Sequence, residues 1–453
     1  ILNLMRRRYT TFTLLLLDVA CGVGVFNLAL LLRGLPGGED FLLGSLILPL
    51  GVTMIALYLV DGYNPRCDML SADYASQHLV AFAGATLVVL LVTHALLAGG
   101  YPLQTSRLVS VLAMIAHAAV SLGYRRTIHL RRLERRAQRS LLFIGDGPSL
   151  SSFSAECGRT GLGLRLHALE TASSKAGGAT KLSDKLAELE RDGQHLEAIV
   201  IREAAAGVTE SESRRLTELH FAGVPTLTLE LFYQEYWRRI PLYRLNPTWL
   251  FQEGFKVARE PVYFHLKRLS DIAFSLVGLV VAAPVIAVAM VAIRWEDRGP
   301  VFFAQSRVGL NQRRFRLFKL RTMAVDAGSG SLYTQPGDRR ITRVGAFLRN
   351  TRLDELPQLW NVLRGDMSLI GPRAEWDRLV ETYEREIPCY HFRHLVKPGI
   401  TGWAQVNYPY GASIEDTARK LEYDLYYIRH FSFTLDAAIV LKTIHTVLGG
   451  KGR

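Results

Sequence analysis

Long apolar runs constrain this chain more than any other feature of its 453 residues. Four of them lie in the first quarter: Tyr9–Leu32, Phe41–Val60, Leu79–Ala98 and Leu108–Tyr124. About 20 helical residues span the hydrocarbon core of a bilayer, so three runs are long enough and the fourth is marginal. The runs predict a four-helix transmembrane bundle with a basic linker over residues 1–138. Asp18 in the first run is either functional or a packing residue beside a polar neighbour.

Basic residues flank this predicted bundle at both ends. Three arginines precede it, and seven follow it: Arg6, Arg7 and Arg8, then Arg125, Arg126, Arg131, Arg132, Arg135, Arg136 and Arg139. Because basic loops stay on the cytoplasmic side, an even number of crossings places the N-terminus and everything after residue 125 in the cytoplasm. The same residues explain much of the net charge of +13, and no nucleic-acid-binding signature accompanies them, so nucleic acid is not an expected partner.

A fifth apolar run, Ile272–Ile293, has basic residues on both sides. A simple crossing would carry the last third of the chain out of the cell, against the rule that basic flanks stay inside. Pro284 lies in the middle of the run, where it removes a backbone hydrogen bond and bends a helix. We therefore expect a re-entrant membrane helix over 263–294 that breaks near Pro284 and returns to the same face, with a true span as the alternative.

The segment 139–250 alternates strand and helix patterns. Short apolar strands are expected at Leu141–Ile144, Leu164–Leu169, Ala198–Ile201 and Pro225–Leu229, with helices between them. This alternation predicts a Rossmann-like α/β domain with a parallel sheet. Gly145 and Gly147 form a turn that either cradles a phosphate, with Glu170 near a ribose, or serves structure alone, because the third glycine of the nucleotide-binding pattern is missing.

Cations and one carboxylate pair gather in the last third of the chain. Lys319 and Arg321 alternate on a predicted strand and so project to one face. Further on come Arg349, Arg352, Asp354, Glu355 and Arg373. A pair of acids within a ring of cations has the composition of a diphosphate-binding site.

Pro357 limits where the next helix can begin, since proline fits only the first turn. A helix over Leu356–Leu363 then places Asp354 at or near its N-cap, where an ionised carboxylate is favoured and can attack phosphorus. Mg²⁺ held by Glu355 and Asp354 would neutralise the repulsion between carboxylate and phosphate. The alternative is structural: Asp354 caps the helix and Glu355 pairs with an arginine.

Five blocks in this region resemble the bacterial sugar transferases, which start exopolysaccharide and O-antigen synthesis. They are spread over about residues 263–453 and are Lys267–Asp271, Phe318–Met323, Leu353–Leu363, Gly365–Arg373 and Lys397–Val406. With the four spans and the middle domain, the chain looks like the large undecaprenyl-phosphate glucose or galactose phosphotransferase subtype. Two positions depart from the family pattern: Gln312 and Tyr408 stand where glycine is usual.

The resemblance implies a mainly α-helical α/β catalytic domain over 295–453, on the cytoplasmic face of the bacterial inner membrane. It implies a UDP-sugar donor, an undecaprenyl phosphate acceptor, release of UMP, Mg²⁺ dependence and a homodimer. Asp354 matches the nucleophile and Glu355 its metal-associated partner. The remaining matches are the phosphate-binding cations Lys319, Arg321, Arg349, Arg352 and Arg373 and the membrane-interface residues Lys267, Arg268, Asp271 and Pro284. A second possibility is a membrane-anchored nucleotide sensor whose C-terminal domain is catalytically idle.

Overall fold

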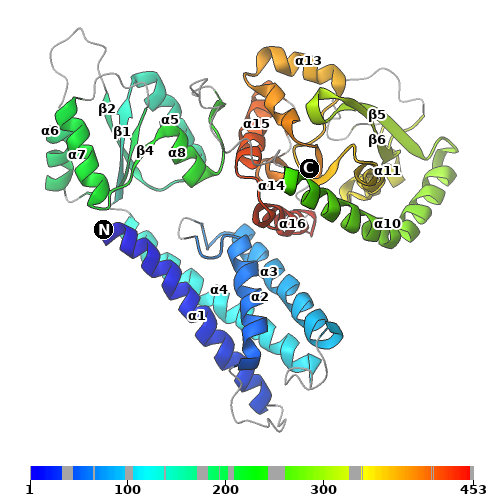
Figure 1. Cartoon of the computed structure of the whole chain (residues 1–453), viewed down its shortest axis with the longest axis horizontal. Helices are drawn as coiled ribbons and strands as arrows, with labels where there is room; N and C mark the ends of the chain where they lie inside the picture. The colour runs from blue at the N-terminus through cyan, green and yellow to red at the C-terminus, as the bar shows by residue number, and fades with distance from the viewer. Residues whose placement is uncertain are drawn as a thin grey trace. The chain divides into compact units, whose positions relative to one another are not determined.

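A computed structural model describes residues 2–32, 44–64, 67–96, 106–136, 139–170, 182–192, 194–202, 209–242, 261–325, 338, 340–409, 411 and 413–448. Parts of the predicted segments lie outside these residues, among them 33–43, 97–105, 137–138, 171–181, 203–208, 243–250, 326–337 and 449–453. The chain divides into two compact units, Ile1–Trp237 and Arg238–Arg453. Figure 1 shows the elements of each unit.

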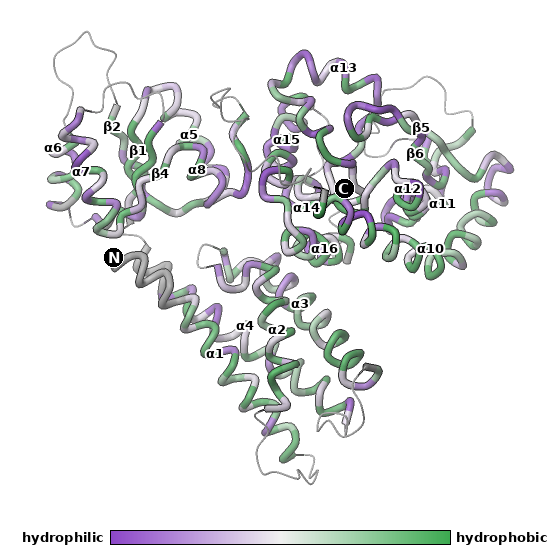
Figure 2. The backbone as a smooth tube through the Cα atoms, in the orientation of Figure 1, coloured by the Kyte–Doolittle hydropathy of each residue, from purple (hydrophilic) through white to green (hydrophobic). Residues whose placement is uncertain are grey.

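The first unit begins with four membrane-type helices, α1 (Leu2–Leu32), α2 (Ile47–Leu59), α3 (Ala72–Leu91) and α4 (Arg107–Arg136). Among the described residues, the apolar stretches Thr11–Leu32, Ala72–Ala95 and Arg107–Arg131 are long enough to cross a membrane, whereas the helical stretch Gly44–Leu59 is shorter. The marginal helix is therefore the second one and not, as the sequence predicts, the fourth. Figure 2 shows that α2 and α3 are predominantly hydrophobic.

A parallel sheet follows in the same unit. Its strands are β1 (Arg139–Gly145), β2 (Arg165–Glu170), β3 (His195–Ile201) and β4 (Thr226–Thr228), in the order β2-β1-β3-β4. Alternate residues of β1 enter two different cores, because successive side chains of a strand point to opposite faces. Leu141 and Phe143 pack with α5 (Gly147–Arg159) and α8 (Leu229–Phe232), whereas Leu142 and Ile144 pack with α6 (Leu182–Arg191) and α7 (Glu210–Phe221).

The second unit is mainly helical and begins before the expected catalytic domain. Ile240 and Leu242, which the sequence assigns to the middle domain, are buried in its largest core. Arg239 forms an ion pair with Glu422 at 2.9 Å, and Trp403 Nε1 donates to the carbonyl of Arg238. We name Arg238–Leu242 the strap, because it closes this core from outside the segment that resembles the family.

The long helix α10 (Pro261–Asp297) opens the main part of the second unit. It continues through Pro284 as one helix, so the prediction that the helix breaks near Pro284 is wrong. Figure 1 shows that its ribbon changes direction midway, as a proline that removes one hydrogen bond bends a helix without ending it. Its apolar stretch, Val262–Asp297, is the fourth in the described part of the chain with the length and composition of a membrane helix.

Short elements on both sides of the acid pair complete this unit. A hairpin of β5 (Phe302–Val308) and β6 (Arg314–Leu320) precedes α11 (Arg343–Asn350), the 3₁₀ turn η8 (Leu353–Glu355) and α12 (Gln358–Arg364). Then come β7 (Ser368–Ile370), α13 (Asp377–Glu386), η9 (Tyr390–Leu395), β8 (Gly399–Thr401), α14 (Trp403–Asn407), α15 (Ile414–Arg429) and α16 (Phe433–Leu448). β7 and β8 form a parallel pair.

Candidate active site

Asp354 and Glu355 lie in the 3₁₀ turn η8, between α11 and α12. Pro357 itself is the N-cap of α12, which begins at Gln358. Asp354 lies near this N-cap, three residues before it, and the structural alternative that Asp354 caps the helix is wrong, because the backbone makes a separate tight turn before the proline. Arg352 precedes that turn in the left-handed region, at φ 59°. Both acids are buried.

Three cations converge on a single oxygen of Glu355. Lys319 Nζ lies 2.7 Å from Glu355 Oε1, Arg373 Nη2 lies 3.5 Å from it and Arg352 Nη1 lies 3.7 Å from it. Burial alone would raise the pKa of Glu355, but Lys319 and Arg373 outweigh it and hold that pKa far below its usual range. Glu355 is therefore a stable anion at neutral pH.

Asp354 differs from its neighbour in both contacts and ionisation. Within the described part of the chain, its carboxylate makes no hydrogen bond or ion pair. Burial raises its pKa, against the opposing influence of Lys319, while the charge of Glu355 raises the pKa further. Adjacent acids whose environments shift their pKa values in opposite directions are suited to different roles.

Lys319 owes its position to β6 and to an asparagine that the sequence reasoning missed. The fully buried Asn361 of α12 accepts a hydrogen bond from the amide of Phe318 at 3.0 Å and donates one to the carbonyl of Arg316 at 2.7 Å. These two bonds fix the strand that carries Lys319 against α12. Burial lowers the pKa of Lys319, and the charge of Glu355 opposes that shift.

Two of the other predicted cations have separate partners. Arg321 lies just beyond β6 and forms a bidentate pair with Asp297 at the end of α10, with one contact of 2.7 Å. Arg349 donates from Nε to Thr322 Oγ1 at 2.7 Å, yet its charge still lowers the pKa of Asp354. The structure thus gathers Lys319, Arg352 and Arg373 on Glu355, places Arg349 within electrostatic range and directs Arg321 to α10.

The expected membrane-interface residues tie α10 to the rest of the unit. Lys267 pairs with Asp436 of α16 at 2.6 Å, and Arg268 donates to the carbonyls of Val362 and Leu363 at the end of α12. Asp271 accepts hydrogen bonds from the side chain of Ser368 and the amide of Leu369, at 3.1 and 3.0 Å. No feature of the sequence pairs these residues, because their partners are about a hundred or more positions away.

The acid pair offers carboxylate oxygens, which are the donors that Mg²⁺ prefers. No cluster of three or more His, Cys, Asp or Glu side chains with metal-binding geometry occurs among the described residues. Mg²⁺, however, commonly binds through one or two carboxylates together with waters and substrate phosphates. Glu355, ionised and next to Asp354, fits this requirement.

The family described as "Bacterial sugar transferase" matches residues 262–450. A UDP-N-acetylgalactosamine-undecaprenyl-phosphate N-acetylgalactosaminephosphotransferase from Aeromonas hydrophila is 48% identical over 193 residues, 42% of this chain and 46% of the relative. A UDP-glucose:undecaprenyl-phosphate glucose-1-phosphate transferase from Xanthomonas campestris pv. campestris is 43% identical over 43% of this chain and 41% of the relative.

A shorter relative is matched along nearly its whole length. The exopolysaccharide production protein PSS from Rhizobium leguminosarum bv. phaseoli is 40% identical over 195 residues, 41% of this chain and 98% of that protein. The similarity to the two longer relatives, by contrast, spans less than half of their length.

Proposed function

Because this chain belongs to the bacterial sugar transferase family, we propose that it transfers a sugar-1-phosphate from a UDP-sugar to undecaprenyl phosphate and releases UMP. The observation that carries the proposal is the acid pair, in which Glu355 is held by three cations and Asp354 by none of them directly. UDP-glucose and UDP-galactose are the donors expected from the sequence, and UDP-N-acetylgalactosamine joins them because of the Aeromonas relative.

In the first half-reaction, an oxygen of Asp354 attacks the β-phosphorus of the UDP-sugar. The bond from that phosphorus to the bridging oxygen breaks, UMP leaves with the electron pair, and an aspartyl phospho-sugar remains. We expect the diphosphate to bind to Lys319, Arg352 and Arg373, the three cations beside Glu355. These cations stabilise the charge that develops on the leaving UMP. The burial of Asp354 keeps its anion poorly solvated and therefore reactive.

In the second half-reaction, a phosphate oxygen of undecaprenyl phosphate attacks the same phosphorus. The acyl phosphate bond breaks, the lipid diphospho-sugar forms, and the Asp354 carboxylate is regenerated. Mg²⁺ bound by Glu355 with Asp354 would supply charge neutralisation between carboxylate and diphosphate. One site can thus serve a water-soluble donor and a lipid acceptor in turn.

The contacts of α10 support a re-entrant arrangement in the membrane. Near its start, Arg268 and Asp271 bind α12 and β7; at its end, Glu296 accepts a hydrogen bond from the amide of Arg343, the first residue of α11, at 2.8 Å. A straight helix would separate Asp271 and Glu296 by about 37 Å, more than the hydrocarbon core of a bilayer. Since both ends bind one compact unit, we propose that α10 enters and leaves the membrane on the cytoplasmic face.

The outward face of α10 supports the same arrangement. Most of its large apolar side chains are exposed, among them Phe274, Val277, Val281 and Val288. In water such a face would be costly, whereas it is stabilised against lipid chains. We also propose a homodimer in the bacterial inner membrane, as the family resemblance implies; a chain that is only monomeric on cross-linking in nanodiscs would count against that part.

The middle domain is proposed to be Rossmann-like without a phosphate site in its glycine turn. Asp146 caps α5 by accepting a hydrogen bond from the amide of Ser149 at 2.7 Å, and it also forms an ion pair with Arg202. A phosphate at this helix start would meet the carboxylate of Asp146. Because the Asp146 carboxylate already accepts the amide at this helix start, a nucleotide sensor that uses the Gly145–Gly147 turn is disfavoured.

The central test is UMP release by the full chain in nanodiscs that contain undecaprenyl phosphate, with UDP-glucose, UDP-galactose and UDP-N-acetylgalactosamine. We expect UMP from one donor before any acceptor is added, in an amount equal to the enzyme, and a matching mass increase on the protein. Glu355→Gln should slow this burst, whereas Glu384→Gln, an exposed control on α13, should not. Release that strictly requires both substrates would replace the covalent route with direct transfer.

The topology has its own test. In a chain whose four native cysteines are replaced by serine, a single cysteine after residue 300 should react with an impermeant reagent only once the cells are permeabilised. Labelling in intact cells would overturn the re-entrant proposal, and Pro284→Leu should move the variant toward that result because the helix then straightens.

A further inference from the structure

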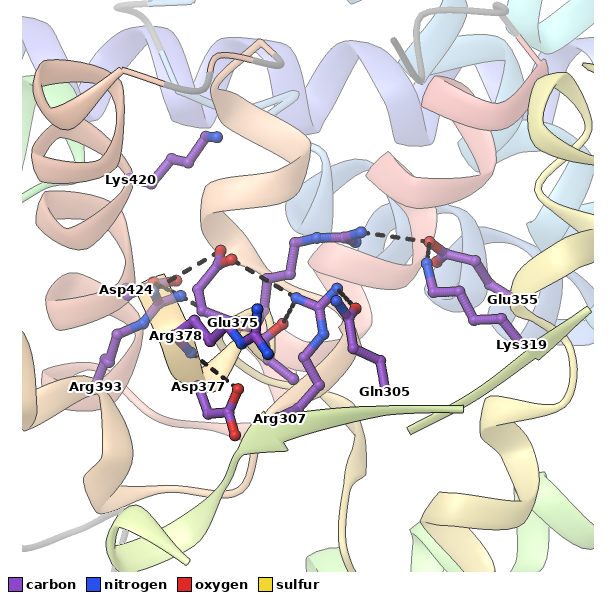
Figure 3. A network of polar contacts seen from close by, with 12 residues as sticks. Gln305, Arg307, Lys319, Glu355, Glu375, Asp377, Arg378, Arg393, Lys420 and Asp424 are labelled. Carbon is purple, nitrogen blue, oxygen red and sulfur yellow. Dashed lines mark hydrogen bonds and ion pairs between the residues drawn. The ribbon is translucent and has the colours of Figure 1, made fainter. Parts of the chain in front are cut away.

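Arg373 projects from a loop, Gly371–Glu375, whose backbone is held by the buried Arg393 and the partly buried Arg307. Arg393 in η9 donates from Nη2 to the carbonyl of Arg373 at 3.0 Å, and Arg307 of β5 donates from Nη1 to the carbonyl of Ala374 at 2.9 Å. Figure 3 shows the charged network that runs from Arg393 past Glu375 and Arg307 toward Glu355. The loop is therefore fixed by side chains that do not themselves reach the acid pair.

Arg393 is in turn held by a rigid set of partners. Its Nη2 lies 2.9 Å from Asp424 Oδ2 of α15, and its Nη1 donates to the hydroxyl of Tyr390 at 2.7 Å. The side chains of Arg393 and Asp424 are only 4% and 2% exposed. A buried pair with this geometry is rigid, because leaving either charge without its counterpart inside the protein is costly.

The other edge of the same loop is fixed by backbone contacts. The amide of Gly399 donates to the carbonyl of Pro372 at 2.8 Å, and the amide of Gly371 donates to the carbonyl of Thr401 at 2.9 Å. A Cβ on Gly399 would lie 2.1 Å from the amide nitrogen of Gly371, so only glycine allows this approach. With both edges fixed, the orientation of the Arg373 side chain toward Glu355 depends on where Arg393 holds its carbonyl.

We propose that Arg393, held by Asp424, is a positioning residue that aims Arg373 at the acid pair and at the donor diphosphate. The proposal rests on the proposed function, because it assigns Arg373 to that reaction. The guanidinium is required, since its planar fork binds a carboxylate, a hydroxyl and a carbonyl at once, whereas the ammonium of lysine is a compact point charge on a flexible stem. Arg393→Lys should keep the pairing with Asp424 and loosen the loop.

A double-mutant cycle separates this role from general stabilisation of the fold. In the full chain, we expect Arg393→Lys to lower the rate of UMP release about 10- to 100-fold, as displacement of a substrate-binding group does. In an Arg373→Gln background the same change should cost less than about twofold, because the group that it positions is gone. An equal loss in both backgrounds would overturn the proposal. Arg385→Lys, an exposed arginine on α13, is the matched control.

Hydrogen exchange tests the same claim without relying on activity. In Arg393→Lys, peptides that cover residues 371–375 should exchange faster by about threefold or more, while peptides from α12 stay unchanged. Faster exchange across the whole unit, or none in the loop, would contradict a positioning role. If the unmodified chain releases no UMP from any donor, the proposed function fails, whereas the exchange result still decides whether Arg393 holds the loop.

Discussion

Two buried charge clusters, one in the helix bundle and one at the acid pair, differ in how completely their carboxylates are paired with cations and hydrogen-bond donors. In the bundle cluster, formed by Asp18, Ser121, Tyr124 and Arg125, the guanidinium binds both oxygens of Asp18, at 2.9 and 2.8 Å. Ser121 adds a third bond to the same carboxylate at 3.0 Å. At the acid pair, three cations crowd one oxygen of Glu355, and Asp354 takes none of them as a direct partner.

The difference separates a structural cluster from a reactive one. The Asp18 carboxylate is already paired with Arg125 and Ser121 of α4, so we expect Asp18 to act as a packing residue that joins α1 to α4. The Asp354 carboxylate is buried without a direct partner among the described residues, which makes its anion energetically unfavourable in the fold, while the positive charge gathered around Glu355 favours an incoming phosphate. Substitutions at the two clusters should consequently affect different quantities.

The largest expected effect is on the activity of Asp354→Asn. We expect UMP release to fall at least about 10³-fold, because the amide is not a nucleophile. The thermal midpoint should stay equal or rise, since burial raises the pKa of Asp354 and its ionised form therefore destabilises the fold. The raised pKa means that the folded chain binds this proton more tightly than the unfolded chain does. The stability advantage of the variant should accordingly shrink as the pH falls through that raised pKa toward the ordinary range of an aspartate.

These two quantities are measured on one preparation, with Asp377→Asn as a control from the same unit. Thermal unfolding in nanodiscs at several pH values is compared with the rate of UMP release. An Asp354→Asn chain that keeps near-normal turnover, or one that is markedly less stable at neutral pH, would remove the distinction between the two clusters.

In the bundle cluster the opposite result is expected from Asp18→Asn. The Arg125 guanidinium would remain buried without its counter-charge, and breaking such a pair costs about 3–5 kcal/mol of unfolding free energy. The double variant Asp18→Asn with Arg125→Gln should recover most of this loss, because no lone charge is left. Folded molecules of either variant should release UMP at the normal rate. A loss of turnover without a loss of stability would instead make Asp18 functional.

A smaller effect is expected at the strap, where a third buried pair has a spare partner. Arg239→Gln removes the 2.9 Å contact to Glu422, but Arg419 Nη1 remains 3.4 Å from the same carboxylate oxygen. We expect a loss of about 1.5–3 kcal/mol, the value of a hydrogen bond to a charged group, and an additional loss when Arg419→Gln is combined with it. Strictly additive losses would show that the two arginines do not share Glu422.

The sequence predicted local features well and partnerships poorly. The β1 to β4 strands and the proximity of Lys319, Arg352 and Arg373 to Glu355 follow from periodicity and motif composition, and the helical character of the second unit follows from the family resemblance. The pairing of Arg321 with Asp297 and of Lys267 with Asp436 does not, because each depends on how α10 bends and on what it meets. The sequence does not predict the strap for the same reason. Its two apolar residues, Ile240 and Leu242, become part of a core only through packing with residues such as those of α15, almost 200 positions later.

The smallest expected effect compares two residues that share the left-handed backbone region, Arg352 beside the acid pair and Gln312 in the remote turn after β5. Glycine adopts this conformation without the steric cost that other residues incur. Arg352→Gly and Gln312→Gly should therefore each change the unfolding free energy by less than about 1 kcal/mol, toward greater stability. For Gln312, the gain is reduced by the lost hydrogen bond from Nε2 to Glu384 at 3.0 Å.

Their activities should differ even though their stabilities change alike. Arg352→Gly removes one of the three cations on Glu355, a half-exposed contact at 3.7 Å, and we expect about a tenfold lower rate of UMP release, equivalent to about 1.4 kcal/mol in the barrier. Gln312→Gly should leave that rate unchanged, because the Gln312 side chain binds Glu384 of α13 and its turn packs on η9. Equal rates for the two glycine variants would mean that the strained conformation of Arg352 does not serve the acid pair. Of the three cations on Glu355, only Lys319 and Arg373 would then contribute to the reaction.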